Sequence, residues 1–360
     1  MARFKVPWVV PNFQKEDINS IKRVLDSGWL SMGEEVKKFE KETSSYLNIK
    51  YAVAVNSGTS ALDTALKCLG IGSGDEVIIP AFTYVATGNV VVYNHGTPVF
   101  VDIDDTLNIN PLLIEEKITE KTRAIINIDF GGNVSNYSKL KHISEKYDIP
   151  LIVDGAQSFG CEYHGKKCCT HGLINTTSFH VAKILTTVEG GMVFTDNKDL
   201  FNMARIIRNQ GQTSRYIHSY LGNNYRMLDI VAVMGTSQIK RFEKTLNERI
   251  GKVQYYKEQL ENVEYPKELK QTKSSYFLFI ILTKKRDKLN KYLNEKGIET
   301  RINYPLPVNE QQTLKKYSNE IFPKSRDIAN QVLSLPLSDK LTINQQDYVI
   351  RNVNSFFKRY

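Results

Sequence analysis

The most informative segment is Thr177–Asp196, TSFHVAKILTTVEGGMVFTD, in which a strand-like run ends at Phe179 and Lys183 follows among apolar neighbours. Lysine is rarely placed in apolar company, because burial disfavours its ammonium form. The same burial lowers the pKa of the amine, and an uncharged amine is a nucleophile that can form a Schiff base. Taken alone, the segment also fits a surface lysine whose stem lies along apolar residues.

A second segment, Leu151–Ser158 (LIVDGAQS), places a carboxylate at the end of an apolar run. In open α/β sheets, ligands bind just beyond the carboxyl ends of the strands. Asp154 at such a position can pair with a protonated ring nitrogen, the partner that a heterocyclic electron sink requires. The alternative is that Asp154 only caps a helix.

Two further strand ends carry polar or aromatic residues. In Asn56–Leu62 (NSGTSAL), a glycine permits a tight turn and hydroxyl residues begin a helix. Such a turn presents backbone N–H groups and the positive end of a helix to an anion such as a phosphate. In Pro80–Thr87, Tyr84 follows another strand end, where its ring could stack on a flat ligand. Ordinary helix capping and a core aromatic are the respective alternatives.

Outward from these segments, short apolar runs alternate with helix-length segments between about residues 50 and 200. The strand candidates are Ala52–Val55, Glu76–Pro80, Pro98–Val101, Arg123–Ile128, Pro150–Asp154, Thr176–Phe179 and Gly191–Thr195. The helix candidates, including two before the first strand, are Asp17–Leu25, Val36–Leu47, Ser60–Leu69, Tyr84–Asn94 and Ser138–Tyr147. Nearly continuous apolar strands separated by helices predict an α/β fold, with a mostly parallel seven-stranded sheet covered by helices on both faces.

After Ile239 the chain becomes more charged and more helical. Lys240–Leu260 contains no strong helix breaker and predicts one long helix, and Ser275–Leu282 predicts a strand. A length of 360 residues suggests at least two domains. We therefore expect a large domain over residues 1–240 and a smaller C-terminal domain over residues 241–360.

The composition is that of a globular protein, with a formal net charge of +9 from 48 Lys and Arg against 39 Asp and Glu. The basic residues are spread along the chain, which favours a generally lysine-rich surface or an anionic small substrate over a nucleic-acid partner. The apolar runs are too short to span a bilayer, and no signal peptide is recognisable. Four cysteines without zinc-like spacing are typical of reduced thiols. We expect a cytoplasmic protein without a metal, nucleic-acid or membrane partner.

Together these segments resemble the PLP-dependent nucleotide-sugar aminotransferases of the DegT/DnrJ/StrS group, where PLP is pyridoxal 5′-phosphate. The combination of SFHxxK with an upstream DxxQ is specific, and the resemblance extends over nearly the whole chain. It includes VLDSGWLSMG, GDEVIIPAFTYVAT, VDGAQSFG, NYRMLDI and GIETRINYPLPV. The resemblance implies a fold-type I transferase, in which the large sheet domain is followed by a smaller C-terminal α+β domain.

The resemblance also implies roles around the cofactor ring. Lys183 would hold PLP as a Schiff base and later move a proton between cofactor and substrate. Asp154 would pair with the ring nitrogen, Gln157 would approach the ring hydroxyl, and Tyr84 would stack on the ring.

Further residues would hold the phosphate and the substrate. The phosphate ligands implied within one chain are Gly58, Thr59 and Ser178. Asn224 matches an asparagine that reaches the phosphate from a neighbouring subunit, so we expect a homodimer with composite active sites. Arg226 and Tyr304 are the expected substrate-binding residues.

The chain departs from the family pattern at four places. Val188 stands where a glycine usually precedes Glu-Gly-Gly, and Asn223 stands where an aromatic residue is more common. Asp129–Gly131 replaces a His-Leu-Tyr-Gly-like strand end, and Asn303–Asn309 lacks two usual histidines. The last two departures touch the expected sugar pocket.

The function implied is the conversion of a nucleotide-linked keto-sugar to an amino-sugar, with L-glutamate as donor and 2-oxoglutarate as co-product. Many relatives act on 4-keto-6-deoxy sugars, which favours that class, and a 3-keto sugar is the close alternative. A PLP-dependent sugar dehydratase is less favoured, since such relatives typically have histidine in place of Lys183. A non-enzymatic binding protein remains the alternative from another class.

Overall fold

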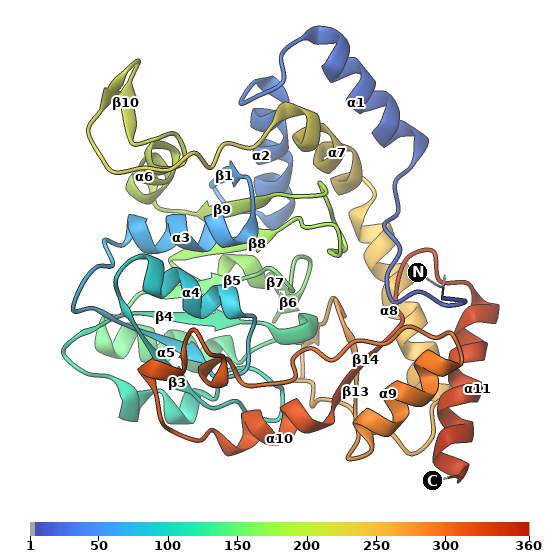
Figure 1. Cartoon of the computed structure of the whole chain (residues 1–360). Coiled ribbons are helices and arrows are strands. Elements are labelled where there is room, and N and C mark those ends of the chain that lie inside the picture. The colour runs from blue at the N-terminus through green and yellow to red at the C-terminus, as the bar shows by residue number, and fades with distance from the viewer. Residues whose placement is uncertain (1–3, 360) are drawn as a thin grey trace.

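The computed structural model describes residues 4–359 and is built around one large sheet (Figure 1). Its seven strands lie in the order β1-β9-β8-β5-β4-β2-β3. They are, in that order, Tyr51–Val55, Gly191–Thr195, Ile174–Ser178, Leu151–Asp154, Thr122–Ile128, Glu76–Pro80 and Thr97–Val101. Strand β9 is antiparallel to both neighbours, and the other adjacent pairs are parallel. The predicted mostly parallel seven-stranded sheet is confirmed.

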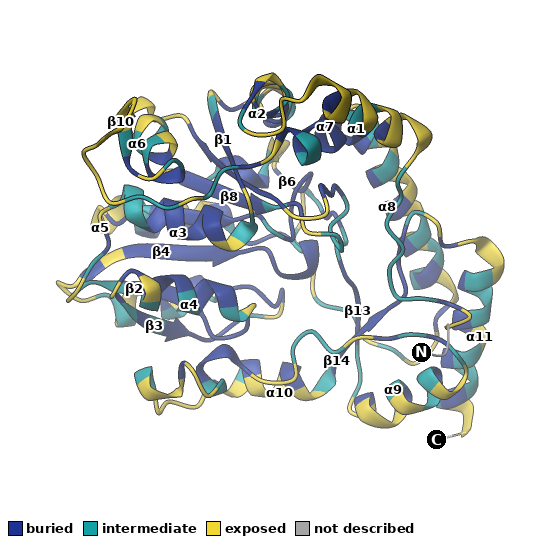
Figure 2. Cartoon of the chain, turned by 45° about the horizontal axis from the view of Figure 1, so that its top comes forward, coloured by how far each residue is buried: buried dark blue, intermediate teal, exposed yellow. Residues whose placement is uncertain are grey.

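Helices cover both faces of the sheet, and its strands are buried throughout most of their length (Figure 2). Because successive side chains of a strand point to opposite faces, Val53 and Val55 join one apolar cluster while Ala52 and Ala54 join another. The first face is covered by α3 (Gly58–Cys68), α4 (Val85–Tyr93) and α6 (Lys198–Arg208). The second is covered by α2 (Glu34–Leu47), α5 (Tyr137–Tyr147) and α7 (Asp229–Ile239).

The N-terminal helices α1 (Lys15–Ser27) and α2 pack against α7. Helix α2 begins at Gly33, which has no side chain to cap the helix. Buried Asp229 supplies the cap from α7, since its Oδ1 accepts hydrogen bonds from the N–H groups of Gly33 at 2.8 Å and Val36 at 3.2 Å. A carboxylate at a helix N-terminus is also favoured by the helix dipole.

The C-terminal part begins with α8 (Phe242–Gln259), which leads away from the large sheet (Figure 1). The C-terminal part has an apolar cluster of its own, in which α8 packs with the antiparallel strands β13 and β14 and the helices α9 and α11. These elements are Phe279–Leu282, Val332–Leu335, Arg286–Glu295 and Ile343–Arg359. We infer a domain boundary near residue 240 from this second cluster, although Val308, Leu314 and Phe322 return to the core of the large sheet.

The remaining elements are short. They include α10 (Pro323–Gln331), the hairpin β10–β11 (Gln212–Ser214 and Ile217–His218), the three-stranded sheet β12-β6-β7 (Thr272–Lys273, Glu162–Tyr163 and Lys166–Lys167) and several 3-10 helices of three residues each. The predicted strand Ser275–Leu282 is shorter in the structure, because its first half bonds to the Gly131–Gly132 turn instead of to a strand. Over residues 4–359, none of the helices combines the length and apolar character needed to cross a bilayer.

Two helix glycines provide a matched test of the packing between α2 and α7. A Cβ atom on Gly235 of α7 would lie 2.4 Å from the ring of Phe39, whereas one on Gly251 of α8 would meet nothing within 4 Å. We expect Gly235→Ala to lower the free energy of unfolding by about 1–3 kcal/mol through overpacking. Gly251→Ala should raise it by about 0.4–1 kcal/mol, because alanine restricts the unfolded chain.

Urea unfolding monitored by circular dichroism measures both changes. Equal stability of the two variants would contradict the tight helix contact at Phe39.

Candidate active site

The carboxyl ends of β5 and β8 place two of the predicted site segments side by side. The strands are parallel neighbours, and Asp154 at the end of β5 is paired with Thr176 near the end of β8. The chain continues from β8 through Ser178 into the turn that carries Lys183. The sheet register therefore brings the predicted carboxylate and the predicted amine to one site.

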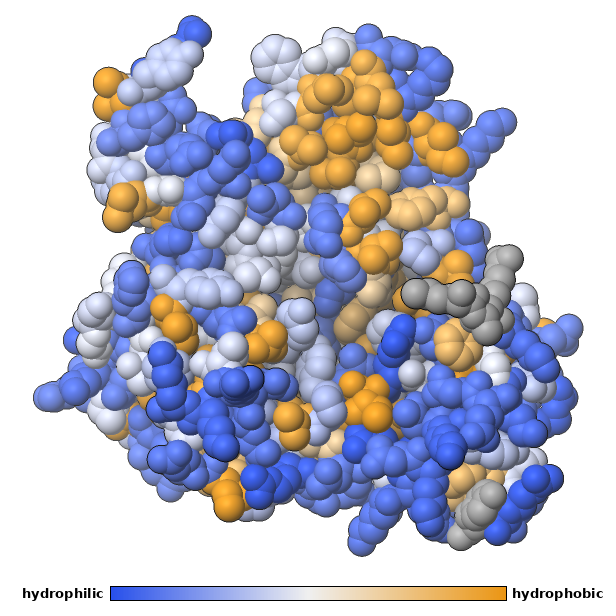
Figure 3. Space-filling model, viewed as in Figure 1, coloured by the Kyte–Doolittle hydropathy of each residue, from blue (hydrophilic) through white to orange (hydrophobic). Residues whose placement is uncertain are grey.

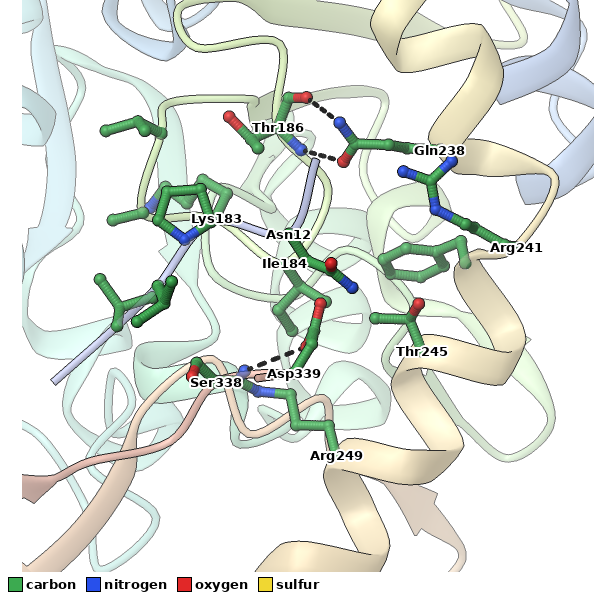
Figure 4. Close-up of a pocket in the computed structure, with 16 residues that line it drawn as sticks. Asn12, Lys183, Ile184, Thr186, Gln238, Arg241, Thr245, Arg249, Ser338 and Asp339 are labelled. Carbon is green, nitrogen blue, oxygen red and sulfur yellow. Dashed lines mark hydrogen bonds and ion pairs between the residues drawn. The ribbon is translucent and has the colours of Figure 1, made fainter. Parts of the chain in front are cut away.

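The turn that carries Lys183 is fixed from both ends. The N–H of Lys183 donates to the carbonyl of His180 at 2.8 Å, and the N–H of Thr187 donates to that of Phe179 at 2.9 Å. Gln238 at the end of α7 binds Thr186 twice, accepting from its N–H at 3.0 Å and donating to its carbonyl at 2.7 Å (Figure 4). Both residues are buried, so the turn is anchored to α7.

Burial shifts the pKa values of Lys183 and Asp154 toward each other. Desolvation lowers the pKa of Lys183 to about 8, and the nearby Asp154 carboxylate opposes this shift. Desolvation raises the pKa of Asp154 to about 6, against the N–H of Ala156 and the charge of Lys183, which both favour the carboxylate. A desolvated amine beside a carboxylate at strand ends is the kind of perturbed pair that functional sites contain.

Tyr84 and Tyr304 form an aromatic wall beside this pair. Tyr84 is 53% exposed and its ring centroid lies 5.8 Å from that of Tyr304. The Tyr304 ring also contacts Phe82 and Phe130, and burial raises its pKa. One face of Tyr84 is thus available to a ligand while the other side is packed.

Gln157 connects the aromatic wall to the end of β4. Its Oε1 accepts the N–H of Gly131 at 2.7 Å, and its side chain hydrogen-bonds Tyr304. The side chain is buried, so this predicted site residue has one defined position.

Gly58, Thr59 and Ser178 meet at the N-terminus of α3. Ser57 caps this helix by accepting the N–H of Ser60 at 3.1 Å. A Cβ on Gly58 would lie 2.7 Å from the Cβ of Ser178, so only glycine allows this approach. The first N–H groups of a helix have no intrahelical partner, and this N-terminus can therefore accept an anion beside Ser178.

Asn224 and Arg226 lie beside the end of β1, the edge strand. The N–H of Asn56 donates to the carbonyl of Tyr225 at 3.0 Å, and its Nδ2 donates to that of Asn224 at 3.3 Å. The Asn224 side chain is exposed, and Arg226 donates to Oδ1 of Asn209 at 3.0 Å. The segment is thus held near α3 by its backbone, on the opposite side of the site from Tyr304's packed cluster with Phe82 and Phe130.

The departure at Val188 falls on a backbone conformation that glycine favours. Val188 has φ +70°, which is unusual for a β-branched residue, and it is exposed. Its N–H donates to Oγ1 of Thr186 at 2.9 Å, and Oγ1 of Thr187 donates to the carbonyl of Glu189 at 2.7 Å. These threonine bonds hold the turn in this conformation, although the residue at its positive-φ position is not glycine.

Two residues near the site were not among the predicted site residues, although Asp129 belongs to one of the departures from the family pattern. Asp129 is fully buried, accepts the hydroxyl of Tyr137 at 2.5 Å, and contributes to the raised pKa of Asp154. Phe277 places its ring 4.2 Å from Nζ of Lys183. Phe277 is far from Lys183 in the sequence, so no local motif connects them.

The charge of Asp154 should be visible in the titration of Lys183. Since the carboxylate stabilises the ammonium, Asp154→Asn should lower the pKa of Lys183 further, by roughly one unit in the cofactor-free protein. The pH dependence of acetylation of the Lys183 peptide, followed by mass spectrometry, measures this shift. Asp199→Asn, an exposed carboxylate in the first turn of α6, is the control and should leave the titration unchanged. An unshifted curve in Asp154→Asn would contradict the pairing.

The comparisons with known proteins agree over the whole chain. The model of the DegT/DnrJ/EryC1/StrS aminotransferase family matches residues 11–354. The dTDP-3-amino-3,6-dideoxy-alpha-D-galactopyranose transaminase of Aneurinibacillus thermoaerophilus is 33% identical over 348 residues, covering 96% of each chain. GDP-perosamine synthase of Escherichia coli O157:H7 is 33% identical over 363 residues, covering 98% of each. The crystal structure of S. venezuelae DesV, in complex with a ketimine intermediate, has a TM-score of 0.96 at 31% identity and full coverage of both chains. The chain therefore belongs to the DegT/DnrJ/EryC1/StrS aminotransferase family.

Proposed function

We propose that this enzyme transfers an amino group from L-glutamate to a nucleotide-linked 4-keto-6-deoxy sugar, releasing 2-oxoglutarate. The chain is a nucleotide-sugar aminotransferase that uses pyridoxal phosphate, as its family and structural relatives do. The observation that carries the proposal is the desolvated Lys183 beside Asp154 at the ends of β8 and β5.

The side chains present fit PLP at its amine-reactive carbon, ring nitrogen, phosphate and ring face. Lys183 supplies the amine, and Asp154 supplies a carboxylate for the ring nitrogen. The α3 N-terminus, with Gly58 and Ser178 in close approach, suits the phosphate. Tyr84 supplies an exposed aromatic face for the ring. When bound, PLP withdraws electrons from the carbon that carries the transferred nitrogen.

Each residue then has a defined task. Asp154, ionised above about pH 6, would hold a proton on the ring nitrogen of the bound cofactor. Lys183 has a pKa of about 8, which is close enough to neutral pH for its amine both to accept and to return a proton. Tyr84 and Tyr304 shield one side of the site from water, and Gln157 fixes Tyr304. An amine can act as both acid and base at one position when its pKa lies near the working pH and the side chains around it are held in place.

The most specific part of the proposal is the identity of the sugar substrate. The 4-keto-6-deoxy class is favoured by the family resemblance. A 3-keto sugar is the alternative, since two relatives are named for 3-amino sugars and a third for a 3-oxo sugar. Lys183 disfavours the dehydratase alternative. Because the two curated relatives described above with the active site are named for dTDP- and GDP-linked sugars, an assay panel must contain both nucleotides.

The test is a transamination assay of the purified protein with glutamate against dTDP-, GDP- and UDP-linked 4-keto and 3-keto sugars. Formation of 2-oxoglutarate with a 4-keto sugar supports the proposal, and turnover with 3-keto sugars alone would overturn the 4-keto assignment. Lys183→Ala should keep its fold, lose the visible absorbance of covalently bound PLP and lose at least about a hundredfold in turnover. Lys141→Ala, an exposed lysine of α5 away from the site, is the matched control. Full activity of Lys183→Ala would contradict the assignment.

We also propose a homodimer, because large apolar side chains are exposed in two places. The hairpin β10–β11 projects from the sheet (Figure 1), and Tyr216 and Leu221 beside it are 77% and 95% exposed. A second patch lies over α1 and α7 (Figure 3) and contains Ile18, Leu25, Trp29, Leu30 and Leu228. Apolar surface of this extent is typical of an interface. The four free cysteines of the chain suit a reducing compartment, so we propose a cytoplasmic location.

Composite sites would make two inactive variants complement each other. In a two-fold dimer, Asn224 would complete the partner's phosphate site, so a hybrid of Lys183→Ala and Asn224→Asp subunits has both lesions in one site and leaves the other intact. We expect partial activity to return after the variants are refolded together, and each variant refolded alone to stay inactive. Distinct affinity tags confirm subunit exchange. Hybrids without recovered activity would show that each chain builds its site alone.

A further inference from the structure

Phe277 and Lys183 face each other across a small cavity. The Lys183 Nζ atom lies 4.2 Å from the centroid of the Phe277 ring, and both residues line a cavity with Gln157 and Ser178. An ammonium over an aromatic face is stabilised by the ring quadrupole. Phe277 is only partly buried, so core packing alone does not account for its position.

The segment that carries Phe277 is held on one side by the Gly131–Gly132 turn. The N–H of Ser275 donates to the carbonyl of Gly132 at 3.1 Å, and the N–H of Leu278 donates to that of Gly131 at 3.0 Å. Both glycines have positive φ, and a Cβ on Gly132 would lie 2.8 Å from the backbone nitrogen of Phe277. The two backbones approach this closely because no side chain separates them.

Arg249 of α8 holds the same segment from the other side. Its Nε donates to the carbonyl of Tyr276 at 2.7 Å, and its Nη2 donates to that of Phe277 at 2.8 Å. The side chain is buried, and burial lowers its pKa to about 10, while Asp339 at 3.9 Å opposes this shift. A buried cation whose donors bind two successive carbonyls fixes the backbone there, and a lysine could not reproduce this planar fork.

We propose that Phe277 is a positioning residue that holds the amino group of Lys183 whenever this lysine is not covalently bound, and that Arg249 fixes Phe277 for this task. The inference rests on the proposed function, in which the lysine is released and must then move a proton. A free lysine stem has several rotatable bonds, so a defined resting place shortens its search for the proton.

Besides the Phe277 ring, a small number of charged groups affect the charge state of Lys183. Asp154 from β5 favours the ammonium form, as the ring does. A second cavity lies on the other side of the Lys183 turn (Figure 4). It is lined by Arg241 just before α8, by Arg249 of α8 and by Asp339 from the loop after β14. A test must therefore change the ring without changing these charges.

The first test is the titration of Lys183 in cofactor-free protein, from acetylation rates of its peptide. Phe277→Leu should lower the apparent pKa of Lys183 by roughly one unit, because the ammonium loses its aromatic partner. Phe277→Tyr retains a ring and should titrate as the parent does. Circular dichroism and thermal unfolding establish that both variants are folded. A folded Phe277→Leu protein with the parental titration would overturn the proposal.

The second test concerns Arg249. Arg249→Lys keeps the charge but loses the paired carbonyl bonds, and should shift the Lys183 titration in the same direction as Phe277→Leu. The double variant should shift no further than Phe277→Leu alone, because both changes act through one ring. Lys252→Arg is the control, since it keeps the charge on α8 and Lys252 binds the carbonyls of Ser338 and Asp339 but not this segment. Additive shifts, or an equal shift in the control, would overturn the role of Arg249.

Both measurements use neither cofactor nor sugar, so their outcome is separate from that of the transamination assay. If the Phe277→Leu enzyme is active and its Lys183 titrates as in the parent protein, the positioning role is refuted and the proposed function is not. In the loaded enzyme, we expect Phe277→Leu to lower kcat by roughly tenfold with little change in KM for the sugar, and Phe277→Tyr to restore kcat. A change in KM alone would contradict a role in proton movement.

Discussion

The candidate site depends on the mutual stabilisation of the partly buried Lys183 ammonium and the buried Asp154 carboxylate. Desolvation disfavours the charged form of each group, and the opposite charge of the other group counteracts this effect. The pair exists because β5 and β8 are parallel neighbours, so that two segments separated in sequence end at the same edge of the sheet. The opposite pKa shifts of the two groups follow from this one arrangement.

Close backbone approach then shapes the remainder of the site. A Cβ on Gly58 would collide with Ser178, and one on Gly191 would lie 2.2 Å from the carbonyl oxygen of Ser57. These contacts press the N-terminus of α3 against the ends of β8 and β9. The anion-binding end of α3 is thereby held near Ser178, which leads directly into the Lys183 turn. The distance between the Lys183 amine and the N-terminus of α3 is therefore fixed.

The sheet and most of the proposed site were predictable because their signals are local. Asp154 and Gly58 follow apolar strands, Lys183 stands among apolar neighbours after another strand end, and the seven strand candidates of the large sheet differ from the observed strands by at most two residues at either end. The roles of Phe277 and Arg249 were not predictable, since they come from contacts between distant segments, and Asp129 was recognised only as a departure from the family pattern. Val188 shows a further limit, because its positive φ is maintained by threonine hydrogen bonds that the sequence pattern does not reveal.

Helices α7 and α8 connect the two sides of the Lys183 environment. Gln238, at the end of α7, binds the turn that carries Lys183, and Arg249, on α8, binds the segment that carries Phe277. The two helices are consecutive and separated by only Lys240 and Arg241. A displacement of α8 relative to the sheet would therefore disturb the Arg249 bonds to the Phe277 segment, while the Gln238 bonds would still tie the Lys183 turn to α7. The junction between α7 and α8 thus links the position of the Lys183 amine to that of the Phe277 ring.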